Sequence, residues 1–102
     1  MSKLKSVTGT FAANGNSSEC NIKSGAIVHV GGSGGTDFGG GTVTIQFQGS
    51  DGAWYNSQET MTAANVLRIE TPVPCNIRLN LASSTSPDLD YVIQSDVVDL
   101  VE

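Results

Sequence analysis

Residues 42–57 read TVTIQFQGSDGAWYNS, and this stretch decides the fold class. In its first half, apolar residues alternate with threonine and glutamine, which is typical of a strand with one buried face. Asp51 and Gly52 then form a tight-turn pair, and the chain continues with Trp54 and Tyr55 in a second strand-like segment. The stretch therefore predicts a β-hairpin.

The same alternation recurs along the chain and is clearest at 75–81. Further strands are expected at 4–13, 18–24, 26–30, 66–71 and 89–94, with a last strand or arm at 97–101 and a connection at 58–65. About eight strands at this spacing, without interleaved amphipathic helices, predict an antiparallel β-sandwich. We expect one small domain over 1–102, either jelly-roll or immunoglobulin-like, with extended arms at 1–5 and 96–102.

Composition excludes several classes of function. The 102 residues carry a formal net charge of −5 and only 15% charged residues, with five lysines and arginines in all. So few cations cannot follow a phosphate backbone, so we expect no nucleic-acid partner. One histidine and two distant cysteines cannot build a four-ligand zinc site. No run of 18 apolar residues is present, so no membrane span is expected.

Cys20 and Cys75 stand 55 residues apart in a chain that shows no secretory signal. We therefore expect synthesis in a reducing cytoplasm and two small buried thiols. A disulfide is possible only if their strands are neighbours.

The glycines are concentrated in one internal segment, and several charged residues are concentrated at the two ends of the chain. Residues 31–41 hold seven of the twelve glycines, with Phe38 among them. This segment is either a flexible loop, with Phe38 packed on the edge of the core, or a loop whose backbone approaches another chain and whose Phe38 anchors a partner. The basic Lys3 and Lys5 begin the chain, and the acidic segment 96–102 ends it with the apolar Val98 and Leu100. These termini are either solvated edges or head-to-tail contacts.

The candidates for chemistry are few. His29 lies in an apolar strand pattern and is expected on a strand face, and Asp88 with Asp90 reads as a solvated loop rather than an acid–base pair. We therefore expect no catalytic, cofactor-binding or metal-ligating residues. Trp54 and Tyr55 offer an aromatic platform for a sugar ring, with Trp54 in the core as the alternative.

Three segments together resemble the small β-sandwich virion proteins of tailed bacteriophages. They are FGGGTVTIQFQ at 38–48, SDGAWY at 50–55 and PCNIRLNLA at 74–82, the last followed by a Ser/Thr/Pro loop. The resemblance covers residues 26–93. Such chains often carry glycine where this one has Asn65, which affects the local turn.

This resemblance implies a non-enzymatic structural protein of the virion, made in the host cytoplasm and located on the capsid surface. It implies a decoration or cement protein that binds the major capsid protein as a homo-oligomer, with a trimer favoured. Phe38, Trp54, Tyr55, Lys3, Lys5, Val98 and Leu100 are the candidate contacts. The alternative function is a glycan-binding or structural module of a phage tail or neck.

Overall fold

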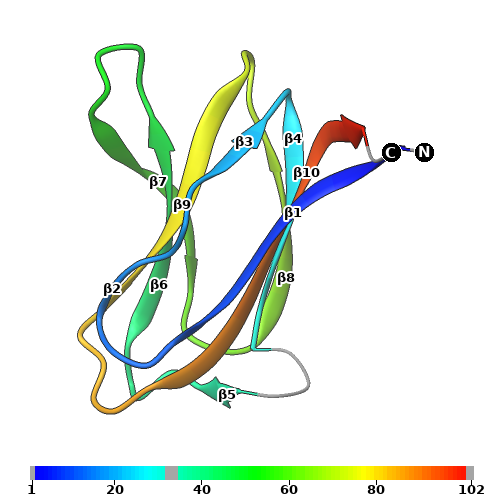
Figure 1. The fold of residues 1–102 in the computed structure, drawn as a ribbon. Coiled ribbons are helices and arrows are strands. Elements are labelled where there is room, and N and C mark those ends of the chain that lie inside the picture. The colour runs from blue at the N-terminus through cyan, green and yellow to red at the C-terminus, as the bar shows by residue number, and fades with distance from the viewer. Residues whose placement is uncertain (1, 32–34, 101–102) are drawn as a thin grey trace.

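The computed structural model describes residues 2–31 and 35–100, with side chains at 5–31 and 35–97, and this part of the chain is all β. Two antiparallel sheets of five strands face each other (Figure 1). Sheet A has the order β1 (Ser2–Phe11), β10 (Asp88–Leu100), β4 (Gly25–Val30) and β8 (Asn65–Glu70), and β5 (Thr36–Asp37) also pairs with β10. Sheet B has the order β2 (Gly15–Asn16), β9 (Cys75–Ala82), β6 (Thr42–Gln48) and β7 (Trp54–Met61), and β3 (Cys20–Ile22) also pairs with β9.

The described chain forms ten strands where about eight were expected. One additional strand is β2, which lies ahead of the segment expected at 18–24 and is separated from β3 by Ser17 and its neighbours. The backbone N–H of Ser17 donates to the Leu79 carbonyl, and its Oγ accepts from the Leu79 N–H, both at 2.8 Å. Between the two short strands, the Ser17 hydroxyl thus takes the place of a backbone carbonyl as the acceptor for the Leu79 N–H. The other additional strand is the two-residue β5, inside the glycine-rich segment.

The connection expected at 58–65 is wrong, because β7 continues to Met61. Thr44 pairs with Thr60, and Gln46 pairs with Asn56. Between these two pairs β7 therefore contains two more residues than β6. This irregularity destroys the alternation of side chains that would have marked a strand.

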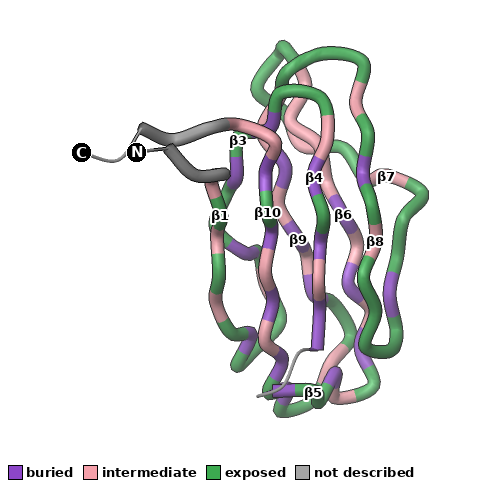
Figure 2. The backbone as a smooth tube through the Cα atoms, turned by 90° about the vertical axis from the view of Figure 1, so that its right-hand side faces the viewer, coloured by how far each residue is buried: buried purple, intermediate pink, exposed green. Residues whose placement is uncertain are grey.

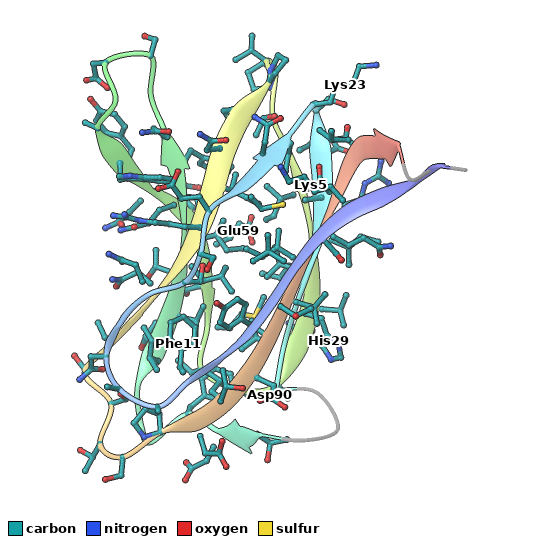
Figure 3. All side chains as sticks on the ribbon, in the orientation of Figure 1. Lys5, Phe11, Lys23, His29, Glu59 and Asp90 are labelled. Atoms are coloured by element: carbon teal, nitrogen blue, oxygen red, sulfur yellow. The ribbon has the colours of Figure 1, made fainter. Side chains whose placement is uncertain are left out.

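The core lies between the sheets and confirms the alternation at 42–48 and 75–81. Val43 and Ile45 of β6 are fully buried, and Figure 2 shows buried positions recurring along the strands of both sheets. In Figure 3, Phe11 points into the space between the sheets, whereas His29 lies on the outside of sheet A. The remaining core residues come from both sheets: Cys20, Ile22, Ala26, Val28, Val30, Phe38, Met61, Ile69, Ile77, Leu79, Leu81, Leu89, Tyr91 and Ile93.

The described part of the glycine-rich segment packs against the loop after β9. The Thr85 N–H donates to the Gly39 carbonyl at 2.9 Å, and Gly39 has a φ of +60°. A side chain at Gly39 would overlap the backbone of Thr85. The close backbone approach expected for this segment is therefore made within the same chain, for the residues that are described.

The two ends of the described chain pair with each other. Lys3 is the cross-strand partner of Asp99, beyond a bulge between Leu4 and Ser6. Strand β10 pairs with β4 only as far as Ser95, so its last residues pair with β1 alone among the described strands (Figure 1). The segments expected as arms at 1–5 and 96–102 thus belong to β1 and β10 over residues 2–5 and 96–100, and residues 2–4 pair with 98–100.

Candidate binding surfaces

The outer face of sheet B is covered by amide side chains. On β9 they stand there because they alternate with buried residues of the same strand, such as Ile77 and Leu79. We call this surface the amide face: Asn16, Asn21, Gln46, Gln48, Trp54, Asn56, Asn76, Arg78 and Asn80. Arg78 is its one formally charged member, in a chain of net charge −5.

Hydrogen bonds join one row of these amides across three strands. Asn21 Nδ2 donates to Asn76 Oδ1 at 3.1 Å, and Asn76 Nδ2 donates to Gln48 Oε1 at 2.9 Å. Gln48 Nε2 then donates to the carbonyl of Gly52 in the hairpin turn, at 3.1 Å. Each amide is therefore oriented by its neighbours, which fixes where its other donors and acceptors point.

A second row of hydrogen bonds joins Arg78, Gln46 and Asn56, and the guanidinium of Arg78 also stacks on Trp54. Arg78 Nε donates to Gln46 Oε1 at 2.7 Å, and Gln46 Nε2 donates to Asn56 Oδ1 at 2.8 Å. The Arg78 Cζ lies 4.2 Å from the centre of the Trp54 ring, which is cation–π geometry. Within the described residues, no hydrogen bond or ion pair uses the two Nη groups of Arg78.

Trp54 and Tyr55 do not form one shared aromatic platform in the structure. Trp54 is half-buried on the outer face of sheet B, opposite Gln48, and is not part of the core. Tyr55 pairs with Phe47 on the opposite parity and is 53% exposed. The two rings therefore belong to different surfaces, as expected for adjacent residues of a strand.

Tyr55 holds the β6–β7 hairpin together. Its hydroxyl donates to Asp51 Oδ2 at 2.5 Å, and Asp51 Oδ1 accepts from the Ala53 N–H at 3.0 Å. These two bonds, the one from Tyr55 foremost, lower the pKa of Asp51 below its usual 3.8. The same carboxylate raises the pKa of Tyr55 above 10.0.

The outer face of sheet A carries a small group of apolar side chains, with Gln94 and Arg68 as the cross-strand partners of Ile27. His29 of β4 has Val92 on one neighbouring strand and Val66 on the other, and Ile27 lies two residues along β4. Ile27 is 47% exposed and Val66 is 53% exposed. We call Ile27, His29, Val66 and Val92 the apolar face; the prediction that His29 lies on a strand face is confirmed.

A shallow depression of about 490 Å³ adjoins the apolar face at one end of sheet A. Its lining includes Ile27 together with Arg68 and Glu70, which form an exposed ion pair at 3.0 Å. Such a pair contributes little to stability, so these side chains can exchange partners readily.

Asp96 holds the turn between β3 and β4 beside this depression. Its carboxylate accepts from the backbone N–H groups of Lys23, Ser24 and Gly25 at 2.7–3.0 Å, and from the Ser24 hydroxyl at 3.0 Å. Burial raises the pKa of Asp96, but these hydrogen bonds outweigh that effect and place the pKa below 3.8.

The expectation that Asp88 and Asp90 lie in a loop is wrong, since both belong to β10. Asp90 Oδ2 accepts from the Gly35 N–H at 2.8 Å, and Oδ1 accepts from the Thr10 hydroxyl at 2.7 Å. These bonds, the one from Gly35 first, lower the pKa of Asp90. Asp90 therefore ties β10 to two neighbouring segments.

The other predicted contact residues are distributed over the molecule. Phe38 is 7% exposed in the core, so in this structure the ring packs within its own chain instead of projecting toward a partner. Lys5 is half-buried on β1. The side chains of Lys3, Val98 and Leu100 lie outside the described side chains.

No disulfide joins Cys20 and Cys75, although their strands β3 and β9 are neighbours. Cys20 pairs with Ile77, and Cys75 pairs with Ile22, so the two cysteines are diagonal rather than opposite. Cys20 is buried, as expected, whereas Cys75 is half-buried. Burial raises the pKa of the Cys75 thiol, although a hydrogen bond with Thr71 opposes this effect.

Over the described ranges, no three side chains of histidine, cysteine, aspartate or glutamate converge as a metal site would require. The same ranges contain no helix long and apolar enough to cross a membrane.

Comparisons with known proteins return little for this chain. No family model matches it, and no curated protein matches it. Among solved structures it is similar to a de novo designed double-stranded beta-helix determined by solution NMR, at 15% identity. That match covers 88% of this chain and 96% of the designed one, with a TM-score of 0.43.

Sequence reasoning found Trp54 but missed the amide face around it. The available signal was the recurrence of polar residues at every second position, as at Gln46 and Gln48 or at Asn76, Arg78 and Asn80. That pattern marks a polar strand face, but only the order of strands in sheet B brings these faces together.

Proposed function

We propose that this protein is a non-enzymatic structural component of a tailed-phage virion, of the capsid decoration or cement type. It acts as a homo-oligomer, with a trimer favoured, on the major capsid protein at the capsid surface. The resemblance carried by residues 38–48, 50–55 and 74–82 supports this proposal. In the fold these segments are β6, the β6–β7 hairpin and β9, which are adjacent strands of sheet B.

We further propose that the topology is a jelly-roll β-sandwich. If β2 and β3 are counted as one strand and β5 is set aside, eight strands remain. Renumbered in chain order, they form one sheet in the order 1-8-3-6 and another in the order 2-7-4-5. This nesting of first with last strand favours two Greek keys over an immunoglobulin-like arrangement. Jelly rolls occur in viral capsid domains and in lectins, so the topology suits both the proposed role and its alternative.

The hydrogen bonds accepted by three aspartates support a role without catalysis. Asp51, Asp90 and Asp96 have lowered pKa values because each accepts hydrogen bonds, at Asp51 from the Tyr55 hydroxyl first and at Asp90 and Asp96 from loop or turn backbone. They stabilise the fold in their charged form, which is the opposite of a general acid prepared for proton transfer at neutral pH.

The apolar face of sheet A is the observation that carries the proposal. Ile27 and Val66 expose about half of their surface on the outside of sheet A, next to a depression with an exposed ion pair. An apolar centre with a polar rim is the usual composition of a protein–protein contact. We propose that this face contacts another protein subunit of the particle.

Purified particles test the proposal. Mass spectrometry should detect the chain in the virion, and cryo-EM of particles with and without it should locate it on the capsid surface. Light scattering of the purified protein should report a trimer. Absence from purified virions would overturn the proposal, while density at the tail or neck would favour the alternative module.

A matched pair of variants tests the contact itself. Ile27→Asp places a charge on the apolar face, and Val73→Asp places one on a somewhat more exposed valine in the loop between β8 and β9. With thermal unfolding of both variants unchanged, we expect only Ile27→Asp to lower particle occupancy. Equal occupancy of the two variants would contradict the proposed contact.

A further inference from the structure

We propose that the amide face of sheet B binds a carbohydrate that carries a carboxylate, such as a uronic acid or a sialic acid, through Arg78. This inference concerns the opposite sheet from the proposed subunit contact and does not depend on the virion role. Its starting point is the guanidinium of Arg78. Gln46 and the Trp54 ring hold this group in place, while its Nη groups have no hydrogen-bond or ion-pair partner within the described residues.

The position of Arg78 is fixed by its neighbours. Its Nε donates to Gln46 at 2.7 Å, and its Cζ lies 4.2 Å from the centre of the Trp54 ring. These contacts hold the plane of the guanidinium, so little rotamer entropy remains to be lost on binding. The Nη groups make no hydrogen bond or ion pair within the described chain.

The Nη groups of Arg78 favour a negatively charged ligand. A guanidinium with free N–H groups binds a carboxylate through strong, charge-assisted hydrogen bonds. Within the described residues no acidic side chain forms an ion pair with Arg78, although acidic residues outnumber basic ones in the chain by ten to five and Glu19 lies just before β3 with the parity of Asn21. The Nη groups are therefore open to the carboxylate of a ligand.

The amides around Arg78 select a polyhydroxylated ligand. Asn56 accepts from Gln46, and Asn76 both accepts from Asn21 and donates to Gln48, so both amides are oriented. An oriented amide still offers a further donor or acceptor to a hydroxyl group. Sugars present neighbouring hydroxyls that both donate and accept, which matches this surface.

A peptide fits the amide face less well. Peptides gain main-chain hydrogen bonds at the open edge of a sheet, whereas β9 and β6 lie inside sheet B with backbone partners on both sides. The amide face also lacks exposed aliphatic side chains to anchor a peptide. An acidic peptide is therefore the competing outcome of the test.

The test is binding of the full chain to a glycan array that includes trigalacturonic acid, sialyllactose and neutral lactose, followed by calorimetry with the strongest binder. We expect carboxylated glycans to bind and lactose to bind at least tenfold more weakly. Arg78→Lys keeps the charge but loses the planar fork, and Arg78→Ala loses both. We expect affinity to fall about tenfold to a hundredfold for Arg78→Ala, and by a smaller factor for Arg78→Lys.

Arg68→Ala is the matched control, because Arg68 is an exposed arginine on the outer face of the other sheet. It should leave glycan affinity unchanged, and thermal unfolding should show that all three variants remain folded. Four results would overturn the inference: no carboxylated glycan binds, lactose binds equally well, poly-glutamate binds as tightly as the glycans, or Arg78→Ala retains full affinity. None of these results bears on whether the chain is found in virions.

Discussion

Ser17 and Leu79 exchange two hydrogen bonds of 2.8 Å although Ser17 belongs to neither β2 nor β3. The backbone N–H of Ser17 donates to Leu79, and the Ser17 hydroxyl oxygen accepts from the Leu79 N–H. This reciprocal pair keeps the interrupted strand attached to β9 and leaves Leu79 fully buried.

Replacing the Ser17 hydroxyl should therefore destabilise the fold. Ser17→Ala leaves the buried N–H of Leu79 without its acceptor, which we expect to lower the free energy of unfolding by about 1–3 kcal/mol. Urea denaturation followed by Trp54 fluorescence measures this change. Ser18→Ala, at an exposed neighbouring position, is the control and should be close to neutral. Equal stability of Ser17→Ala and the parent would show that the pair contributes nothing.

The glycine-rich segment allows two sources of strain to be separated. Gly39 and Gly40 both have positive φ, +60° and +77°, so alanine is strained at either position. A side chain at Gly39 also meets the backbone of Thr85, whereas nothing lies within 4 Å of one at Gly40.

We expect Gly40→Ala to cost about 1–2 kcal/mol, the usual penalty for a left-handed alanine. Gly39→Ala should cost more, because the loops must also separate. Thermal unfolding of the two variants measures the difference. A Gly40→Ala variant as unstable as Gly39→Ala would argue against the close approach to Thr85.

The carboxylate of Asp96 should make stability depend on pH. Because its pKa is lowered in the folded state, its hydrogen bonds stabilise the fold fully above 3.8, the usual pKa. That contribution is lost as the pH falls from 3.8 through the lower folded-state value. Asp96→Asn should lower the melting temperature at pH 7, and its difference from the parent should shrink in strongly acidic solution.

Melting curves from pH 7 down to pH 2.5 measure this convergence. Asp88→Asn is the control, because Asp88 is an exposed carboxylate on the same strand. A difference between parent and Asp96→Asn that stays constant over the whole range would mean that the turn does not depend on the charged form.

The hairpin pair of Tyr55 and Asp51 has a spectroscopic signature. The carboxylate raises the pKa of the Tyr55 hydroxyl above 10.0, so removing the charge should lower it again. Alkaline titration of tyrosinate absorbance, carried out with Tyr91→Phe to leave one tyrosine, should shift to lower pH when Asp51→Asn is added. An unchanged titration would indicate that the two side chains do not interact in solution.

Alternation of side chains predicted much of the fold because strand geometry has a period of two residues. Residues 42–48 and 75–81 form β6 and β9 with the expected buried positions, and the strand at 66–71 ends before Pro72 as proposed. Where the geometry departs from that period, the prediction was wrong. The irregularity in β7 hid four residues of strand, and the two-residue strands β2 and β5 were not predicted.

The candidate site could be predicted only in part. Trp54 was found as a single aromatic residue, but its stacking partner Arg78 lies 24 positions away along the chain. Asn21 and Asn76 are separated by 55 positions and become hydrogen-bonded only because β3 pairs with β9. Nothing local to either residue specifies that pairing.

The sequence by itself determined the class of this protein. Its alternating apolar residues, turn pairs and scarce charges specify short amphipathic strands, and these properties act between residues close along the chain. Only the tertiary structure decided where the strands meet, that Phe38 packs in the core, and that a row of amides surrounds Arg78. Strand order and register depend on contacts between residues far apart in sequence, and the free energy of those contacts is realised only when both sheets close over one core.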